Sequence, residues 1–301
     1  MTLAVTGATG FVGARLLDAA LAAGHKVRAL TRRPLPPRDG VEWVAGSLED
    51  ETALAALVAG ADAIIHVAGV INAPAAAGFE AGNVTGTAAI LAAAGSANAN
   101  RFVHVSSLAA REPGLSLYGA SKARSEALVG RSGIPFAIVR PPAVYGPGDR
   151  EMLDLFRMAR RGLIALPPAG RLSLIHADDL ARLLLALAAT DPPGDIIVEP
   201  DDGHPGGYSH REFAALLGRA VGRTPIALPV PRAMLVAGAA LDMLVRRGGA
   251  RLTRDRAAYF CHPDWVVSPL RAAPPDLWAA RIDTDQGLAD TAQWYRAQRW
   301  L

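Results

Sequence analysis

The hydrophobic positions in the first half of the chain alternate between two patterns. Short runs of consecutive apolar residues are typical of strands buried on both faces, and longer stretches between them have the periodicity of helices. This alternation predicts βαβ units and a parallel sheet covered on both faces. The expected strands are 3–5, 26–30, 42–45, 63–67, 101–105, 135–139 and 195–198, and the expected helices are 11–23, 51–58, about 84–97, 118–129 and 178–189.

The pattern changes after Tyr145. Gly146-Pro-Gly-Asp149 predicts a turn, a helix is expected to about Arg161, and the chain beyond Pro200 is expected to be rich in loops. The fold class is therefore α/β, a Rossmann-type doubly wound parallel sheet with a smaller, discontinuous C-terminal substrate lobe. We expect residues 1–145 and 171–199 to form the dinucleotide-binding domain, and residues 146–170 and 200–301 to form the lobe.

Composition narrows the function classes. The 301 residues are 51% hydrophobic and 20% charged, with a formal net charge of +3, as in an ordinary globular protein. Scattered arginines without interleaved aromatic residues give no support for nucleic-acid binding. Cys261 is the one cysteine and the histidines lack metal-ligand spacing, so neither a disulfide framework nor a metal site is expected. Met1 leads within two residues into a strand, so we expect no targeting segment and a cytoplasmic location.

A conspicuous apolar stretch covers residues 233–245. It is too short to span a bilayer and contains Asp242. Arg232 and the pair Arg246-Arg247 flank it, which allows a helix on a membrane surface. A helix that packs within the protein or faces the substrate is the alternative.

A glycine-rich turn joins the first expected strand to its helix, in the sequence Thr6-Gly7-Ala-Thr-Gly10-Phe-Val-Gly13. Gly7 permits a tight turn, Gly10 lets the backbone approach a pyrophosphate, and Gly13 lets the helix pack closely on the strand. The phosphates would lie at the N-terminus of the helix, where free N–H groups favour negative charge. The turn therefore predicts a site for a nicotinamide dinucleotide.

The end of the second strand distinguishes the two forms of this cofactor. An acidic residue there would bind the ribose hydroxyls of NAD, whereas arginine would pair with the 2′-phosphate of NADP. The sequence has Arg32 and Arg33 and no carboxylate at this point, which favours NADP over NAD. The alternative is that both arginines are solvated at a strand end.

A phenol and an ammonium, Tyr118 and Lys122, are spaced i and i+4, on one face of the expected helix. The pKa of tyrosine is ordinarily about 10. A nearby cation is expected to lower it and so provide an acid or base for catalysis. Ser106 and Ser107 end the fifth strand at the carboxyl edge, where parallel sheets place their sites, and a hydroxyl there could hold the substrate oxygen.

With these motifs the chain resembles the short-chain dehydrogenase/reductase superfamily, in its extended branch of epimerase/dehydratase-like enzymes. The resemblance rests on the glycine turn, Tyr118-x-x-x-Lys122 and the segments His66-Val-Ala-Gly69, Asn83-Val-Thr-Gly-Thr87, Val105-Ser-Ser107, Arg140–Asp149 and Ile175–Leu180. The apolar helix, Leu252-Thr253 and Tyr259 are similar to the hydroxysteroid-dehydrogenase and dihydroflavonol-reductase branches. In this family the helices at 84–97 and 118–129 often pair between subunits, which implies a homodimer.

The resemblance implies roles for individual residues. Tyr118 would be the general acid/base, Lys122 would lower its pKa and hold the nicotinamide ribose, and Ser107 would orient the substrate. The implied cofactor-binding residues are Gly7, Thr9, Gly10, Phe11, Val12, Arg32, Arg33, Ser47, Leu48, Val67, Ala68, Gly69, Tyr118, Lys122, Pro141 and Val144. Ser47 stands where the family often has an aspartate near adenine, which leaves the adenine contact open.

Three reactions remain open. The chain could be an NAD(P)-dependent carbonyl reductase or alcohol dehydrogenase acting on an apolar substrate, a nucleotide-sugar epimerase or dehydratase, or a non-catalytic dinucleotide-binding subunit. Nucleotide-sugar relatives carry an arginine directly ahead of the Ile-His segment, but here Arg171 is displaced by one and Leu172 takes that place. Because Ser107, Tyr118 and Lys122 are all present, the sequence favours the reductase.

Overall fold

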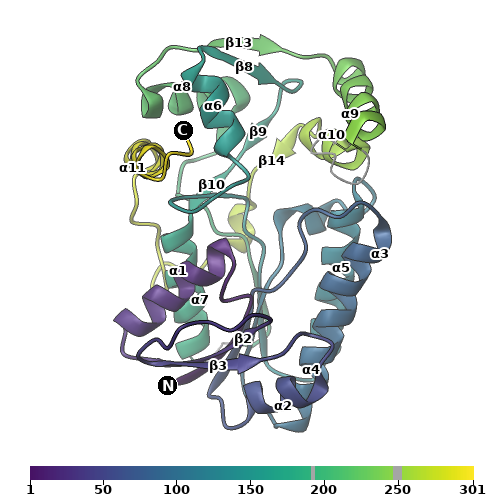
Figure 1. Ribbon diagram of the computed structural model, residues 1–301, viewed down its shortest axis with the longest axis vertical. Helices are drawn as coiled ribbons and strands as arrows, with labels where there is room; N and C mark the ends of the chain where they lie inside the picture. The colour runs from purple at the N-terminus through teal and green to yellow at the C-terminus, as the bar shows by residue number, and fades with distance from the viewer. Residues whose placement is uncertain (191–193, 247–252) are drawn as a thin grey trace. The chain divides into compact units, whose positions relative to one another are not determined.

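The computed structural model describes residues 1–190, 194–246 and 253–301 (Figure 1). Arg247 and Leu252, named above, lie outside the described residues. The chain divides into two compact units. The first contains Met1–Pro141, Leu180–Glu199 and Arg271–Ala279, and the second contains Pro142–Asp179, Pro200–Leu270 and Ala280–Leu301.

The first unit is built on a seven-stranded sheet in the order β11-β6-β5-β4-β1-β2-β3. Every neighbouring pair in this sheet is parallel, which confirms the predicted Rossmann-type α/β fold. The strands are β1 (Thr2–Thr6), β2 (Lys26–Thr31), β3 (Val41–Ala45), β4 (Ala63–His66), β5 (Phe102–Val105), β6 (Phe136–Val139) and β11 (Ile196–Val198).

Helices cover both faces of this sheet. Figure 1 shows α1 and α7 on one face and α4 and α5 on the other. The helices are α1 (Phe11–Ala22), α2 (Glu51–Val58), α3 (Ala76–Phe79), the π-helix η1 (Glu80–Thr85), α4 (Gly86–Ser96), the 3₁₀-helix η2 (Leu108–Arg111), α5 (Leu117–Gly130) and α7 (Ala177–Ala189). The helix expected from about residue 84 therefore continues a π-helical turn that begins at Glu80.

The core of the first unit lies between the sheet and these helices. Leu57, Ile90, Phe102 and Ile138 belong to one apolar cluster there and are almost wholly buried. Burying such a side chain stabilises a fold by about 1.5–3 kcal/mol. This core fixes the carboxyl ends of the strands, which carry the predicted site residues.

The second unit contains small sheets and helices. β7 (Ala143–Tyr145) pairs with β10 (Leu174–His176), and β8 (Leu163–Leu166) pairs with β13 (Ile226–Pro229). β9 (Arg171–Leu172) lies between β12 (Tyr208–Ser209) and β14 (Asp264–Trp265). The helices are α6 (Leu153–Arg160), α8 (His210–Val221), α9 (Arg232–Arg246), α10 (Arg254–Phe260) and α11 (Thr284–Ala297), and the 3₁₀-helix η4 covers Pro269–Arg271.

Beyond Pro200 the described residues contain more helix than was predicted. The apolar stretch forms the helix α9, and three further α-helices were not predicted, α8, α10 and α11. They belong to a second unit with its own core, in which Tyr145, Phe156 and Tyr295 are fully buried. α8 even carries clear end signals, since Ser209 and Glu212 form a capping box and Gly222 ends the helix with a φ of 71°.

The division into units differs from the expected one in three stretches. Residues 142–145 and 171–179 belong to the second unit, where β7 and β10 pair in parallel. Arg271–Ala279 belongs to the first unit, where the backbone N–H of Glu199 donates to the carbonyl oxygen of Arg271 at 2.7 Å.

Candidate cofactor and catalytic site

The glycine turn after β1 is closed by the carbonyl oxygen of Gly7. This oxygen accepts from the backbone N–H of Gly10 at 2.9 Å, and Gly7 has a left-handed φ of 75°. A Cβ atom on Gly13 would lie 2.0 Å from the same oxygen, so Gly13 must lack a side chain. Gly10 is the N-cap of α1 and has no side chain to occupy the first N–H groups, which belong to Phe11 and Val12. Thr9 is exposed beside them.

The loop after β4 lies directly against this turn. A Cβ on Gly7 would lie 2.6 Å from the backbone nitrogen of Ala68, and that N–H donates to Thr6 Oγ1 at 3.3 Å. Thr6 Oγ1 is also 2.6 Å from Nδ1 of the buried His66. Val67, Ala68 and Gly69 therefore follow β4 at the same edge of the sheet as the glycine turn.

Asn83 binds the backbone of Val70, at the end of this loop. It was not predicted from the sequence as a site residue. Its side chain accepts from the N–H of Val70 at 2.6 Å, donates to the Val70 carbonyl at 2.9 Å, and donates to Ser121 Oγ at 2.8 Å. Asn83 lies in the π-helix η1, a rare element that is frequent at functional sites. The one available signal was its place in the segment Asn83-Val-Thr-Gly-Thr87.

Lys122 lies buried on α5 with its ammonium at the end of β5. Its Nζ donates to the carbonyl oxygen of Val105 at 2.8 Å, and a Cβ on Gly69 would lie 3.7 Å from it. Burial disfavours the charged form and lowers the pKa of Lys122 to about 8, although the carboxylate of Glu126 opposes this shift. At pH 7 the side chain is therefore still a cation.

The Ser107 hydroxyl lies near enough to the Tyr118 phenol to affect its pKa. The net shift in the pKa of Tyr118 is opposite to the lowering that was predicted from the nearby Lys122 cation. The pKa of the phenol is raised, because desolvation outweighs the opposing effect of the hydrogen bond with Ser107. Tyr118 is therefore protonated at neutral pH.

The two serines at the end of β5 differ in their partners. Ser106 Oγ donates to Glu126 Oε1 at 2.5 Å, and both oxygens of Glu126 accept from Arg140, at 2.9 and 2.6 Å. Such a bidentate pair has a fixed geometry. Ser107 Oγ caps η2 by accepting from the N–H of Ala109 at 3.2 Å. Ser106 is therefore part of a buried ionic network, whereas Ser107 lies outside that network and near the phenol.

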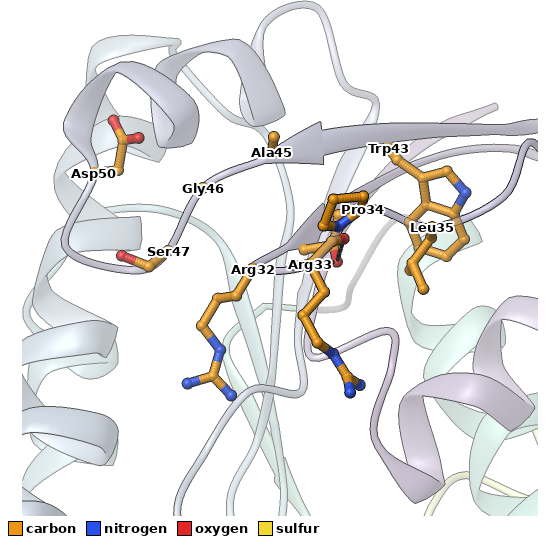
Figure 2. Close-up of a pocket in the computed structure, with 10 residues that line it drawn as sticks. Arg32, Arg33, Pro34, Leu35, Trp43, Ala45, Gly46, Ser47 and Asp50 are labelled. Atoms are coloured by element: carbon orange, nitrogen blue, oxygen red, sulfur yellow. Dashed lines mark hydrogen bonds between the residues drawn. The ribbon is translucent and has the colours of Figure 1, made fainter.

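Arg32 and Arg33 follow β2 and line a hollow with a volume of about 510 Å³. Both side chains are exposed, and among the described residues neither guanidinium has an ion-pair partner. Figure 2 shows Ser47 in the same hollow and the Asp50 carboxylate turned away from both guanidiniums. The Asp50 carboxylate caps α2 by accepting from the N–H of Ala53 at 3.0 Å.

The remaining predicted cofactor residues lie in different settings. Leu48 packs into the core, where its Cδ1 would lie 2.7 Å from a Cβ on Gly86. The carbonyl oxygen of Pro141 accepts from the N–H of Leu108, just after Ser107, at 3.0 Å. Val144 lies in β7 of the second unit, in register with Ile175 of β10.

Two carboxylates, Asp178 and Asp179, lie in the first turn of α7. The Asp179 side chain is buried and accepts from the backbone N–H groups of Arg281 and Ile282, at 3.1 and 3.0 Å. It therefore fixes the chain ahead of α11. Within residues 1–190, 194–246 and 253–301, no cluster of His, Cys, Asp and Glu side chains has the arrangement of a metal site.

Gly13→Ala is predicted to weaken binding of the nicotinamide dinucleotide by roughly tenfold or more. The added Cβ would collide with the Gly7 carbonyl and displace the N–H groups that are predicted to bind the phosphates. A hydrogen bond to a charged group contributes about 1.5–3 kcal/mol. Fluorescence titration with NADPH measures the affinity. Gly95→Ala in α4 is the control, because its Cβ would meet no atom within 4 Å. Equal affinities of the two variants would contradict this account of the turn.

Lys122 is predicted to make stability depend on pH. Its pKa is about 8 in the folded protein and about 10.4 in an unfolded chain, so between these values the unfolded state binds more protons. Stability from this group therefore rises with pH across the window. From pH 7 to pH 10 the unfolding free energy of the wild type should therefore rise by about 2–3 kcal/mol relative to that of Lys122→Met. Urea titrations measure it, and a constant difference would show that Lys122 titrates normally.

Known proteins were compared with this chain by sequence. The profile of the NAD dependent epimerase/dehydratase family matches residues 3–198. A ceramide reductase from Caulobacter vibrioides is 40% identical over 311 aligned residues, which cover 99% of this chain and 96% of the relative. A 4-hydroxy-2-methyl-3-oxo-4-farnesyl-3,4-dihydroquinoline-1-oxide ketoreductase from Stigmatella aurantiaca is 32% identical over 243 residues, covering 71% of each chain. Further relatives include 3-beta-hydroxysteroid dehydrogenases, in agreement with the predicted branch.

Solved structures with the same fold include one with NADPH and one with NAD. A human epimerase family protein with NADPH has a TM-score of 0.75 and 22% identity, covering 97% of this chain and 99% of that one. MoeE5 in complex with UDP-glucose and NAD has a TM-score of 0.75 and 23% identity, covering 99% of each chain. These two likenesses concern the fold alone. The sequence matches go further: this chain belongs to the NAD dependent epimerase/dehydratase family, in the extended branch of the short-chain dehydrogenases/reductases, and is an NAD(P)-dependent enzyme of the oxidoreductase class.

Proposed function

We propose that this enzyme uses NADPH to reduce a ketone on a long-chain, ceramide-like lipid to a secondary alcohol. The observation that carries the proposal is the buried ammonium of Lys122, held at the end of β5 by the carbonyl oxygen of Val105, on the helix that also carries Tyr118. Ser107 lies near enough to the Tyr118 phenol to affect its pKa. The ceramide reductase, similar over nearly its whole length, supports the lipid as substrate class. A ceramide carries a secondary alcohol, so the keto form of such a lipid is the substrate that a reductase would need.

The residues present fit a dinucleotide. The glycine turn and the free N–H groups of Phe11 and Val12 would hold the pyrophosphate, and Lys122, beside Gly69, would hold the nicotinamide ribose. When bound, reduced nicotinamide supplies the hydride that adds to the carbonyl carbon.

Tyr118, Ser107 and Lys122 would transfer the proton to the substrate oxygen and stabilise the charges that this transfer creates. The raised pKa of Tyr118 keeps its hydroxyl protonated at neutral pH, which is the form that can donate a proton to the developing alkoxide. Ser107 donates a hydrogen bond to the substrate oxygen and orients it. The Lys122 cation, one helical turn from Tyr118, stabilises the phenolate that remains until solvent returns the proton. One hydride and one proton convert the ketone to the alcohol.

The second unit gives the nucleotide-sugar alternative no support at Arg171. Its Nε donates to the carbonyl oxygen of Gly206 at 2.7 Å, and a terminal nitrogen donates to that of Gly207 at 2.5 Å. This guanidinium is therefore engaged by its own backbone, whereas a diphosphate site needs arginine with donors to spare. The observation favours an uncharged substrate.

Arg32 and Arg33 support NADP as the preferred cofactor. Two exposed guanidiniums in one hollow at the end of β2 match the bidentate recognition of a phosphate group. The lining carboxylate, Asp50, is used as a helix cap and faces away from them (Figure 2).

Tyr118→Phe is predicted to lower ketone reduction by about 10²–10⁴-fold, the usual contribution of a general acid, while NADPH still binds. The assay follows NADPH oxidation with a ceramide analogue whose secondary alcohol has been oxidised to a ketone, and short ketones serve for comparison. Ser107→Ala should lower turnover, and Ser106→Ala, which alters the Glu126 network, should mainly lower stability. Tight UDP binding without ketone-dependent oxidation of NADPH would overturn the proposed reaction.

Replacing Arg32 and Arg33 together with alanine is predicted to weaken NADPH binding by roughly 10- to 100-fold and to leave NADH binding almost unchanged. Only the 2′-phosphate, present in NADPH alone, would lose its charged partners. Arg38→Ala is the matched control, because Arg38 is paired with Asp18 at 2.6 Å and is not among the residues that line the hollow. An equal loss of affinity for both cofactors would contradict the assignment.

A further inference from the structure

Helix α9 of the second unit exposes apolar side chains along its length. Its ten exposed residues comprise the two terminal arginines, Arg232 and Arg246, and eight apolar residues between them. Met234 is 64% exposed, Leu241 61%, Leu244 76% and Val245 71%. Single exposed apolar residues are common, but a continuous set of this kind marks a contact surface. We name the set Met234, Val236, Leu241, Met243, Leu244 and Val245 the α9 apolar surface.

The polarity of α9 is reversed relative to an ordinary surface helix, which exposes charged residues and buries apolar ones. At about 100° per residue, the packed side of α9 contains Leu235, Ala239 and Asp242. Ala239 is the buried residue of the helix, and Asp242 is only partly exposed. The α9 apolar surface covers the remaining arc, on which the sequence places no charged residue between Arg232 and Arg246. Water is therefore a poor environment for this face.

The charges at the ends of α9 indicate what covers this face. Arg232 begins the helix and Arg246 ends it, and the carboxylate of Asp242 is paired with Arg246 at 3.1 Å. If α9 paired with the α9 of a second copy, arginine would meet arginine in either the parallel or the antiparallel orientation. Anionic lipid headgroups complement basic ends, and the acyl chains below them accept the apolar surface.

We infer that the α9 apolar surface is a docking surface for an anionic lipid bilayer, on which α9 lies in the plane of the interface. None of the described helices is long and apolar enough to cross a membrane, so docking would be superficial. The inference goes beyond the proposed reaction and does not depend on it. If the substrate is a long-chain lipid, the same surface would place the enzyme where that substrate is dissolved.

Flotation of the full-length protein with vesicles tests the inference. The wild type should bind vesicles of phosphatidylcholine and phosphatidylglycerol, bind pure phosphatidylcholine more weakly, and be released by salt. Leu244→Glu should lower the partition coefficient by about tenfold or more, because an exposed leucine would no longer be buried in the bilayer. Leu270→Glu is the matched control, since Leu270 is 97% exposed in η4, outside α9, and this variant should bind as the wild type does.

Arg232→Gln should weaken binding to the anionic vesicles by about fivefold and leave binding to neutral vesicles unchanged, because one basic side chain contributes about 1 kcal/mol near an anionic surface. NADPH oxidation with a short, water-soluble ketone should be the same in the wild type and in Leu244→Glu. This assay keeps a failure of the docking surface distinct from a failure of the proposed reaction.

Three results would overturn the inference. The first is a failure of the protein to show the predicted binding, either because the wild type binds vesicles of neither composition or because Leu244→Glu and Leu270→Glu lose vesicle binding equally. The second is a wild-type dimer in sedimentation that Leu244→Glu dissociates without any change in vesicle binding, which would identify a second copy as the occupant. The third is a raised KM for the soluble ketone in Leu244→Glu with vesicle binding unchanged, which would assign the surface to the substrate.

Discussion

The hydrogen bond from the Lys122 ammonium to the carbonyl oxygen of Val105 is the interaction on which the candidate site depends. It joins α5 to the carboxyl end of β5 inside the protein, so a charge sits where the backbone of the sheet ends. Burying a cation costs free energy unless it is hydrogen-bonded. The pKa of Lys122 is lowered because burial disfavours its charged form. The same position brings Lys122 next to Gly69, where an added Cβ would lie 3.7 Å from the ammonium and only 3.1 Å from Asn83 Oδ1.

The surrounding polar groups divide into those that hold the frame and those left for chemistry. Ser106, Glu126 and Arg140 satisfy one another in a buried network, and Asn83 binds both backbone groups of Val70. Such networks rigidify a structure when every member is paired. Ser107 and Tyr118 form a smaller pair beside them. The side chains of adjacent residues in an extended chain point to opposite sides. Ser106 can therefore belong to the buried network while Ser107, the next residue after β5, remains available for chemistry.

The sequence was sufficient to predict the parallel sheet, because most of its strands, such as β4 and β6, are short apolar runs that need no information from elsewhere in the chain. It also predicted that Tyr118 and Lys122 lie on one helix and that Ser107 follows a strand at the carboxyl edge of the sheet, since helices and strand ends have regular geometry. It could not predict the bonds of Asn83, which depend on a π-helical turn, nor the raised pKa of Tyr118, which depends on desolvation by the folded chain. Strands as short as β9 and β12 pair across distant sequence and leave no periodic signal. The capping box at Ser209 was readable, however, and a search for caps would have found α8.

The distribution of arginine explains how a chain with a net charge of only +3 can suit two kinds of anion. Net charge governs solubility and long-range attraction, whereas recognition depends on where a few charges stand and whether they already have partners. Arg140, Arg171 and Arg38 are engaged by carboxylates or backbone oxygens within the protein. Arg32 and Arg33 stand in a hollow of the first unit, and Arg232 begins the exposed α9 of the second. A phosphate group on a soluble cofactor needs a concave site with two guanidiniums side by side. A lipid surface needs an apolar face that is bordered by positive charge. The two proposed sites therefore have the same residue type with different neighbours, and the neighbours would determine which anion each one binds.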